Sequence, residues 1–128
     1  MRHRMKSLAV SLALAPLGAL AGQAAAATMA SAPLFSVSAV NEQCELTNVS
    51  TKPIVVVSAR LLDASGNDIT DFNDCVGELA PGAVCVFTSD STSSNPHAIV
   101  TLNGSTRATR GQCALFDGST QTVSTPIL

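Results

Sequence analysis

Four cysteines, at positions 44, 75, 85 and 113, are the side chains of this 128-residue chain with the most chemistry to offer. An even number of cysteines in an exported chain predicts disulfides. The competing interpretation is a zinc site, but structural zinc sites usually draw their ligands from close pairs such as C-x-x-C. No two of these cysteines lie nearer than ten residues in the sequence, so we expect no metal.

Four cysteines allow three pairings, and one turn favours a particular pairing. Residues 79–82, Leu-Ala-Pro-Gly, have the composition of a tight turn, since proline fixes φ and glycine accepts positive φ. A hairpin centred there places Cys75 almost opposite Cys85, within disulfide distance. Cys44 and Cys113 are then left to join an early strand to a late one. In the chain-entropy model each bridge stabilises the fold by about 3 to 5 kcal/mol.

His97 is the only histidine after residue 27, so a Ser-His-Asp hydrolase would need it as the base. Because the chain has no G-x-S-x-G motif and serine is common in loops, we expect an ordinary surface histidine. Blue copper requires two histidines and one cysteine, which a single histidine cannot supply. The neighbours that would complete a triad are Ser89, Asp90, Ser91, Ser93 and Ser94.

Acidic and amide side chains gather between residues 68 and 78, and oxygen-rich loops of this kind can hold calcium. Cys75 and Val76 break the EF-hand spacing, so we interpret the cluster as a solvated edge that discourages aggregation. Its members are Asp68, Asp71, Asn73, Asp74 and Glu78. The sequence thus predicts no catalytic residue, no metal and no cofactor.

Two other motifs have ordinary structural interpretations. The N-x-S sequences at Asn48 and Asn103 are formal glycosylation sites, which we interpret as turns whose asparagine accepts positive φ. A positive spot formed by Arg60, Arg107 and Arg110 would need a bulge, because a regular strand places Arg107 and Arg110 on opposite faces.

The first 27 residues have the three parts of a secretory signal: a basic start, an apolar stretch and a run of small residues. The apolar stretch, residues 7–22, is interrupted by Pro16 and Gly18, and a membrane anchor would need about 18 to 25 unbroken apolar residues. We therefore predict a signal helix over residues 1–27, cleaved after Ala27. The product would be secreted or periplasmic, with no membrane attachment after cleavage.

Cleavage would remove three basic residues and leave four against nine acidic ones, a net charge of about −5. Nucleic acids and anionic membranes attract basic surfaces, so neither is expected as a partner. The chain has no Trp and no Tyr, so it lacks the usual side chains that stack on sugars or bases.

Residues 28–128 predict a single all-β domain. Residues 28–33 are small and rich in alanine, and we expect them to be a disordered lead-in. Beyond them, short segments of alternating apolar character are divided by turn residues. We expect seven or eight strands in an antiparallel two-sheet β-sandwich of immunoglobulin-like type. The strands are expected near residues 35–39, 44–47, 53–63, 69–75, 84–89, 97–102, 106–116 and 120–127.

The alternation also assigns core faces. Between residues 53 and 63, the face expected in the core carries Val55, Val57, Ala59 and Leu61.

Two dipeptides, Asn103-Gly104 and Asp117-Gly118, are two-residue hairpin signals. Pro126 either marks the last strand as a sheet edge or ends it early, since proline has no N–H to donate to a ladder.

Short segments of the sequence carry a family resemblance: residues 44–53 (CELTNVSTKP), 55–57 (VVV), 61–67 (LLDASGN) and 79–82 (LAPG). They resemble a loose class of small exported bacterial β-sandwich proteins, mostly uncharacterised, that look like immunoglobulin or fibronectin type III modules. In that class N-x-s-x-x-p-v-x-v marks a strand pair and L-x-P-G marks an inter-strand turn. The resemblance implies a fold and brings no catalytic residues. The chain departs from antibody-type domains in lacking tryptophan.

We therefore expect a secreted or periplasmic, disulfide-bonded protein with a structural or protein-binding role, and not an enzyme. One alternative is a small secreted hydrolase or inhibitor acting through the loop 90–97. Another is a surface-fibre subunit assembled by strand addition at the Pro126 edge. Any partner would be another protein, and we expect the mature chain to be a monomer.

Overall fold

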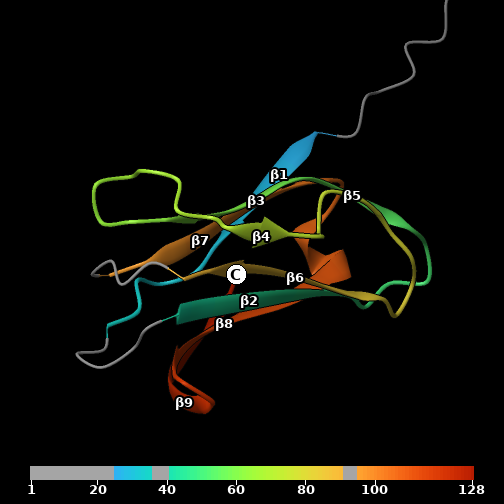
Figure 1. Ribbon diagram of the computed structural model, residues 1–128. Helices are drawn as coiled ribbons and strands as arrows, with labels where there is room; N and C mark the ends of the chain where they lie inside the picture. The colour runs from blue at the N-terminus through green and yellow to red at the C-terminus, as the bar shows by residue number, and fades with distance from the viewer. Residues whose placement is uncertain (1–24, 36–40, 91–94) are drawn as a thin grey trace, which may run out of the picture.

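The computed structural model describes residues 25–35, 41–90 and 95–128, which form two antiparallel sheets packed face to face (Figure 1). The predicted all-β sandwich is therefore confirmed. Residues 1–24 of the predicted signal helix lie outside the described residues. Within these three ranges no helix is long and apolar enough to span a membrane.

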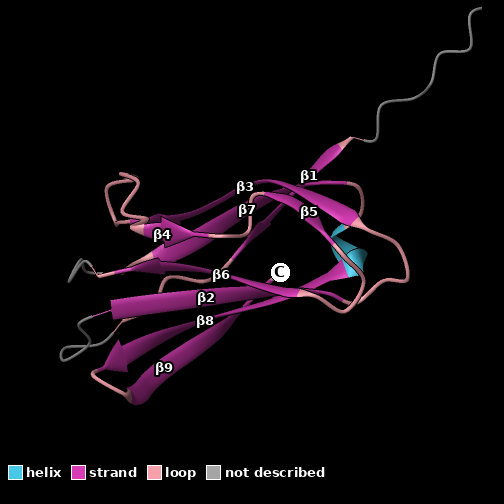
Figure 2. Cartoon of the chain, turned by 45° about the vertical axis from the view of Figure 1, so that its right-hand side comes forward, coloured by secondary structure: helices cyan, strands magenta, loops and turns pink. Residues whose placement is uncertain are grey.

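The four-stranded sheet has the order β1-β7-β3-β5, and the five-stranded sheet has the order β4-β6-β2-β8-β9 (Figure 2). A short 3₁₀ turn, η1 (Thr106–Ala108), precedes β8. The described chain thus has more strands than the seven or eight expected, because β1 and the short β5 were not anticipated. The strands are β1 (Ala26–Ala30), β2 (Asn41–Asn48), β3 (Ile54–Leu62), β4 (Phe72–Asn73), β5 (Gly77–Leu79), β6 (Val84–Ser89), β7 (His97–Asn103), β8 (Thr109–Asp117) and β9 (Thr120–Ile127).

β1 lies where a disordered lead-in over residues 28–33 was expected, so that expectation was wrong. The strand pairs with β7 along its whole length, and Met29 is buried in the core. The backbone of Ala30 also exchanges two hydrogen bonds with Leu128, at 2.9 and 3.1 Å. These contacts hold the segment in place. The predicted cleavage after Ala27 falls inside β1, and the strand expected over 35–39 falls mostly on residues outside the described part.

The core between the sheets is built from the alternating inner face of each long strand. In β6, β7 and β8 the apolar residues of the inner face are buried. The largest fully buried apolar side chains are Phe87, Leu34, Leu46, Leu61, Leu102 and Ile127.

In β3 the predicted inner face is correct in the second half and wrong in the first. Ala59 and Leu61 are buried as expected, but Val55 and Val57 are exposed and Val56 is buried instead. The pairing with β7 has a register shift between Val56 and Ser58, which marks a β-bulge. One extra residue reverses the alternation of every residue before it.

The two hairpin signals have different outcomes. Asp117 pairs with Thr120, so Gly118, at φ 61°, sits in the predicted two-residue hairpin between β8 and β9. The Asn103-Gly104 signal was wrong, because β7 and β8 belong to different sheets. There the chain crosses between the sheets through η1, whose first turn is capped by the Ser105 side chain.

Candidate functional site

Both disulfides are present with the pairing that the sequence favours. Cys44 of β2 lies directly opposite Cys113 of β8, with a Cα–Cα distance of 4.0 Å, and both side chains are fully buried. Cys75 and Cys85 are bonded with a Cα–Cα distance of 4.9 Å. The first bridge therefore joins neighbouring strands of one sheet, rather than the two sheets.

The turn at residues 79–82 does not close a hairpin between the segments that carry Cys75 and Cys85. Those segments nevertheless pair with the register that the hairpin predicted. Asn73 of β4 pairs with Phe87 of β6, and the next backbone bond runs from Asp74 to Val86, at 3.1 Å. This ladder leads directly to the Cys75–Cys85 bridge. Residues 77–79 then leave it to pair with β3 in the other sheet, so the turn at 79–82 connects the two sheets.

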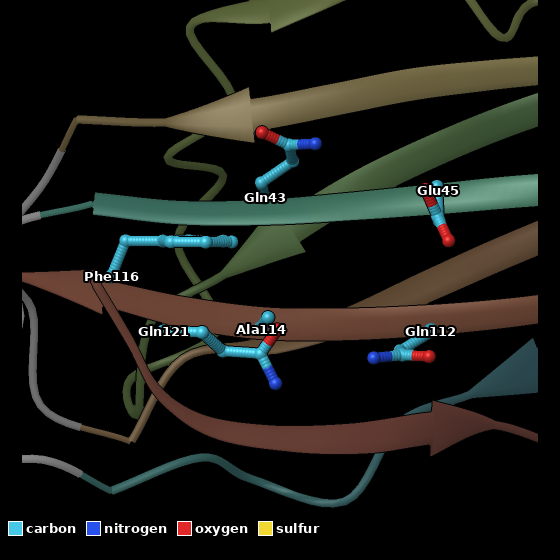
Figure 3. A pocket seen from close by; sticks show the side chains of 6 residues that line it. All are labelled: Gln43, Glu45, Gln112, Ala114, Phe116 and Gln121. Carbon is cyan, nitrogen blue, oxygen red and sulfur yellow. The ribbon is translucent and has the colours of Figure 1, made fainter. Parts of the chain in front are cut away.

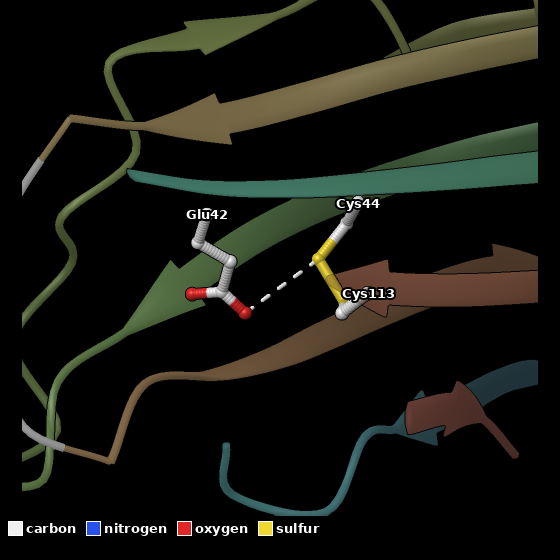
Figure 4. A group of neighbouring side chains, drawn as sticks. All are labelled: Glu42, Cys44 and Cys113. Atoms are coloured by element: carbon white, nitrogen blue, oxygen red, sulfur yellow. Dashed lines mark hydrogen bonds between the residues drawn. A yellow bond between two sulfur atoms is a disulfide. The ribbon is translucent and has the colours of Figure 1, made fainter. Parts of the chain in front are cut away.

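Glu42, which the sequence analysis did not single out, is buried beside the Cys44–Cys113 bridge (Figure 4). Its side chain is 1% exposed, and its Oε1 lies 3.8 Å from Cys44 Sγ. Its Oε2 has no hydrogen-bond partner among the described residues. Burial raises the pKa of Glu42 from 4.5 to about 7. The signal was available, since strand alternation places Glu42 on the same face as Cys44.

Neither cysteine pair offers thiolate ligands in the oxidised protein. Glu42 lies with Cys44 and Cys113, and Asp74 lies with the other bridge. In both groups the sulfur atoms are bonded to each other, and metal binding requires deprotonated thiols.

His97 is half-buried at the start of β7, the strand position that was predicted, and it pairs with Leu62 of β3. Its Nδ1 has no hydrogen-bond partner in the described part of the chain, so no described carboxylate accepts a proton from this nitrogen. Asp90 donates its backbone N–H to Asp71 Oδ2, at 2.7 Å. The triad candidates Ser91, Ser93 and Ser94 lie outside the described residues.

The acidic cluster supplies acceptors that fix local backbone. Asp68 Oδ1 accepts hydrogen bonds from the backbone and hydroxyl of Thr70, at 3.0 and 2.7 Å, and these bonds lower the pKa of Asp68. Asp71 and Asp74 accept backbone N–H groups from the end and the middle of β6. These carboxylates point to different backbone partners, so they form no common ligand set.

The arginines are arranged differently from the expectation. Arg107 lies in η1 rather than in the strand, so it lines one surface hollow with Arg110 without any bulge in β8. Arg110 is held by its own backbone, donating from Nη1 to the Thr109 carbonyl at 2.9 Å.

The outer side of the five-stranded sheet ends at β9, the longest of the four sheet-edge strands that the structure describes. β9 has the sequence TQTVSTPI and carries no charged side chain. Most of its side chains are exposed. Natural proteins usually protect long edges with charges, bulges or short strands. In β9 the described protection is Pro126, one bulge near Phe116 and a bridge from Ile127 to Ser31.

The hydrogen bonds at the C-terminal end of β9 show which of its backbone groups point away from β8. Leu128 exchanges hydrogen bonds with Ala30, on the side away from β8. Since backbone groups point to alternate sides of a strand, Pro126 and Ser124 also face this side. Proline has no N–H, so Ser124 is the nearest residue to offer both a donor and an acceptor at this open edge.

A shallow groove lies on the outer face of the same sheet, next to β9 (Figure 3). Ala114 leaves space at its centre because its neighbours have longer side chains. Three amides, one carboxylate and one aromatic ring surround it. The lining residues are Gln43, Glu45, Gln112, Ala114, Phe116 and Gln121.

Comparison with protein-family models, curated proteins and solved structures finds no match for this chain. The resemblance to small exported bacterial proteins therefore stays a prediction.

Proposed function

We propose that this chain is exported to an oxidising compartment outside the cytoplasm and there binds an extended segment of a partner protein along β9. In this proposal the domain has no catalytic activity of its own. The observation that carries it is the uncharged, outward-facing edge of β9 over residues 120–125, before Ile127 pairs with Ser31. Such an edge is a template for strand addition.

Export is supported by two independent features of the chain. All four cysteines form disulfides, and stable disulfides are typical of secreted and periplasmic proteins. The first 27 residues also have the pattern of a secretory signal.

The chemistry next to the edge favours a polar, uncharged partner segment. An added strand would bond to the backbone of Ser124 and place every second side chain on the outer face, towards the groove. The amides of Gln112 and Gln121 can each donate and accept hydrogen bonds there. Glu45, at the far end of the groove, would repel acidic side chains of the partner segment.

A non-catalytic role is supported by the surroundings of His97. A general base needs an orienting partner and a nucleophile within hydrogen-bond reach. Among the described residues, His97 Nδ1 has no hydrogen-bond partner.

The test uses peptides from a displayed library of random 12-residue sequences, selected on the oxidised mature protein. Hydrogen–deuterium exchange with a selected peptide should show slower exchange at β9. Ser124→Pro removes the outward N–H without affecting the β8 ladder, and it should weaken peptide binding about tenfold or more, the value of one to two hydrogen bonds. Ser124→Ala keeps the N–H and should bind within about twofold of the wild type.

Three results would overturn the proposal: no enrichment of any peptide, protection confined to other strands, or full affinity in Ser124→Pro. A second copy of this chain could occupy the edge in place of a partner protein. Sedimentation velocity over a range of concentrations distinguishes the two cases. A dimer that disappears in Ser124→Pro would show that a second copy of this chain, rather than a partner protein, occupies β9.

A further inference from the structure

While Glu42 is ionised, its contact with the Cys44–Cys113 bridge has no hydrogen-bond donor in the oxidised protein. Glu42 Oε1 lies 3.8 Å from Cys44 Sγ (Figure 4), but a disulfide sulfur carries no proton. Before the bridge forms, Cys44 is a thiol, and the same geometry then allows an S–H···O hydrogen bond to the carboxylate. The same placement therefore puts a carboxylate beside the Cys44 thiol in the reduced precursor of the bridge.

We propose that Glu42 is the general base that takes the thiol proton of Cys44 when the Cys44–Cys113 disulfide forms. The inference concerns formation of the bridge and does not depend on the partner proposed for β9. It requires that β2 and β8 pair with their present register, in which Glu42 lies opposite Leu115 and Cys44 lies opposite Cys113. It also requires that Glu42 and Cys44 are already shielded from water when the bridge closes.

The reaction uses a small disulfide oxidant such as oxidised glutathione. First the Cys113 thiol exchanges with the oxidant, giving a mixed disulfide on Cys113 and releasing one reduced thiol. Glu42 then takes the proton of Cys44, and the Cys44 thiolate attacks Cys113 Sγ. The Cys44–Cys113 bond forms, and the bond to the oxidant's sulfur breaks. The second thiolate leaves with the electron pair, so the two cysteines are oxidised and the oxidant is reduced by two electrons.

Burial explains both why a base is needed and where the proton stays. A free thiol has a pKa of about 8.5, and apolar surroundings raise it, so little thiolate is present at neutral pH. Burial also raises the pKa of Glu42 to about 7, so the carboxyl holds the proton that it receives. The product contains a neutral carboxyl in the core, which costs less than a buried charge.

Among the described residues, no other histidine or carboxylate joins Glu42 beside the Cys44–Cys113 bridge. Glu42 pairs with Ser89 and Leu115, and the ionisable residues that follow these two, Asp90 and Asp117, are exposed. His97, in the other sheet, is half-buried. The segments 36–40 and 91–94 contain no ionisable residue. Burial is the single cause of the raised pKa of Glu42.

The experiment follows reoxidation of the fully reduced chain in a glutathione buffer between pH 6 and pH 9. Acid quenching, alkylation and mass spectrometry separate the glutathione adduct of Cys113 from the closed bridge. Glu42→Gln is expected to slow this closing step about tenfold or more near pH 7. The difference should shrink towards pH 9, where the thiol ionises without help. Closure of Cys75–Cys85 should be unchanged, which makes it the control within the same chain.

A readout on the wild type alone covers the case in which Glu42→Gln does not fold. With a carboxylate base, closure of Cys44–Cys113 should rise less than about threefold between pH 7 and pH 8, while a step limited by thiol ionisation rises about tenfold. A rise of about tenfold in the closing rate of Cys44–Cys113 between pH 7 and pH 8 would overturn the proposal. Equal closing rates in the wild type and Glu42→Gln, or equal slowing of both bridges, would also overturn it.

Discussion

Two buried polar side chains, Glu42 and Asn48, sit at opposite ends of β2 and differ in how their polar atoms are satisfied. Asn48 is fully buried, and its Nδ2 donates to the carbonyls of Lys52 and Leu79, at 2.8 and 2.9 Å. Its Oδ1 accepts from the backbone and hydroxyl of Ser50. Glu42 has a close contact on one oxygen only. A satisfied buried group stabilises a fold, whereas a buried carboxyl stabilises it only while protonated.

Stability should therefore fall as pH rises through the range set by Glu42. In the folded protein its pKa is about 7, above the ordinary 4.5, so the folded state binds this proton more tightly than the unfolded state. The contribution is fully present below about pH 4.5 and is lost as pH rises to about 7, a change of roughly 3 kcal/mol. Urea unfolding of the oxidised protein at pH 4.5 and pH 8 measures it.

Glu42→Gln should remove this dependence, because an amide does not titrate. The variant should match the wild type near pH 4.5 and exceed it at pH 8. Asp63 and Asp68 have lowered pKa values, so their contributions to stability are lost only at more acidic pH. They therefore do not change the stability between pH 4.5 and pH 8. An identical fall in both proteins would show that other groups cause it.

Asn48→Ala should destabilise the domain by about 2 to 4 kcal/mol, because the buried Leu79 carbonyl loses its donor and the Lys52 carbonyl keeps only the Ser50 hydroxyl. Thermal or urea unfolding measures the loss. Asn48→Asp keeps the acceptor for Ser50 but removes both donors, so it should be no better than the alanine variant. A loss below about 1 kcal/mol in both variants would contradict this account.

The sequence pointed to turn chemistry at Asn48 for a partly incorrect reason. Asn48 was expected to accept positive φ, but Asn95 is the non-glycine residue with positive φ in the described chain. The side chain of Asn48 instead bridges a nearby turn to Leu79, 31 residues away. A contact of that range cannot be read from a local motif.

At the scale of elements, periodicity identified most long strands, and the misses have non-local causes. The Leu-Ala-Pro-Gly and Asn103-Gly104 turns were recognised as turns, but local chemistry does not specify whether two consecutive strands share a sheet. The bulge at Val57 follows from pairing between β3 and β7. β1 was missed because its small side chains give little pattern, although pairing with β7 orders it.

Gly111 of β8 tests how tightly β2, β8 and β9 pack. A Cβ at this position would lie 2.8 Å from Leu46 Cδ2 and 2.9 Å from Ile127 Cβ. Gly111→Ala should therefore cost about 1 to 3 kcal/mol, measured by urea unfolding. Gln112→Ala, at the exposed neighbouring position, should change stability by less than about 0.5 kcal/mol. Equal stabilities of the two variants would mean that the three strands can separate without cost.

The same reasoning sets what could be predicted of the candidate site. Pro126 correctly marked the last strand as an edge, because proline is restricted there for a backbone reason. The groove around Ala114 combines side chains from β2, β8 and β9. It therefore depends on the pairing registers of β2 with β8 and of β8 with β9, which local sequence patterns do not specify.

At the scale of the whole molecule, the two bridges should contribute unequally to stability. Cys44–Cys113 spans 69 residues and Cys75–Cys85 spans ten. In the chain-entropy model these loops correspond to about 4 and about 3 kcal/mol. Replacing the first pair by alanines should therefore lower the free energy of unfolding more than replacing the second pair. The opposite order in urea unfolding would show that native contacts, rather than loop length, decide the contribution.

The most direct test of an exported, oxidised binding domain is non-reducing peptide mapping of the protein recovered from the cells that make it. The account predicts a mature N-terminus near Thr28, with one linked peptide pair containing Cys44 and Cys113 and another containing Cys75 and Cys85. Free thiols at these positions, or a chain that still carries residues 1–27 in the cytoplasm, would contradict it.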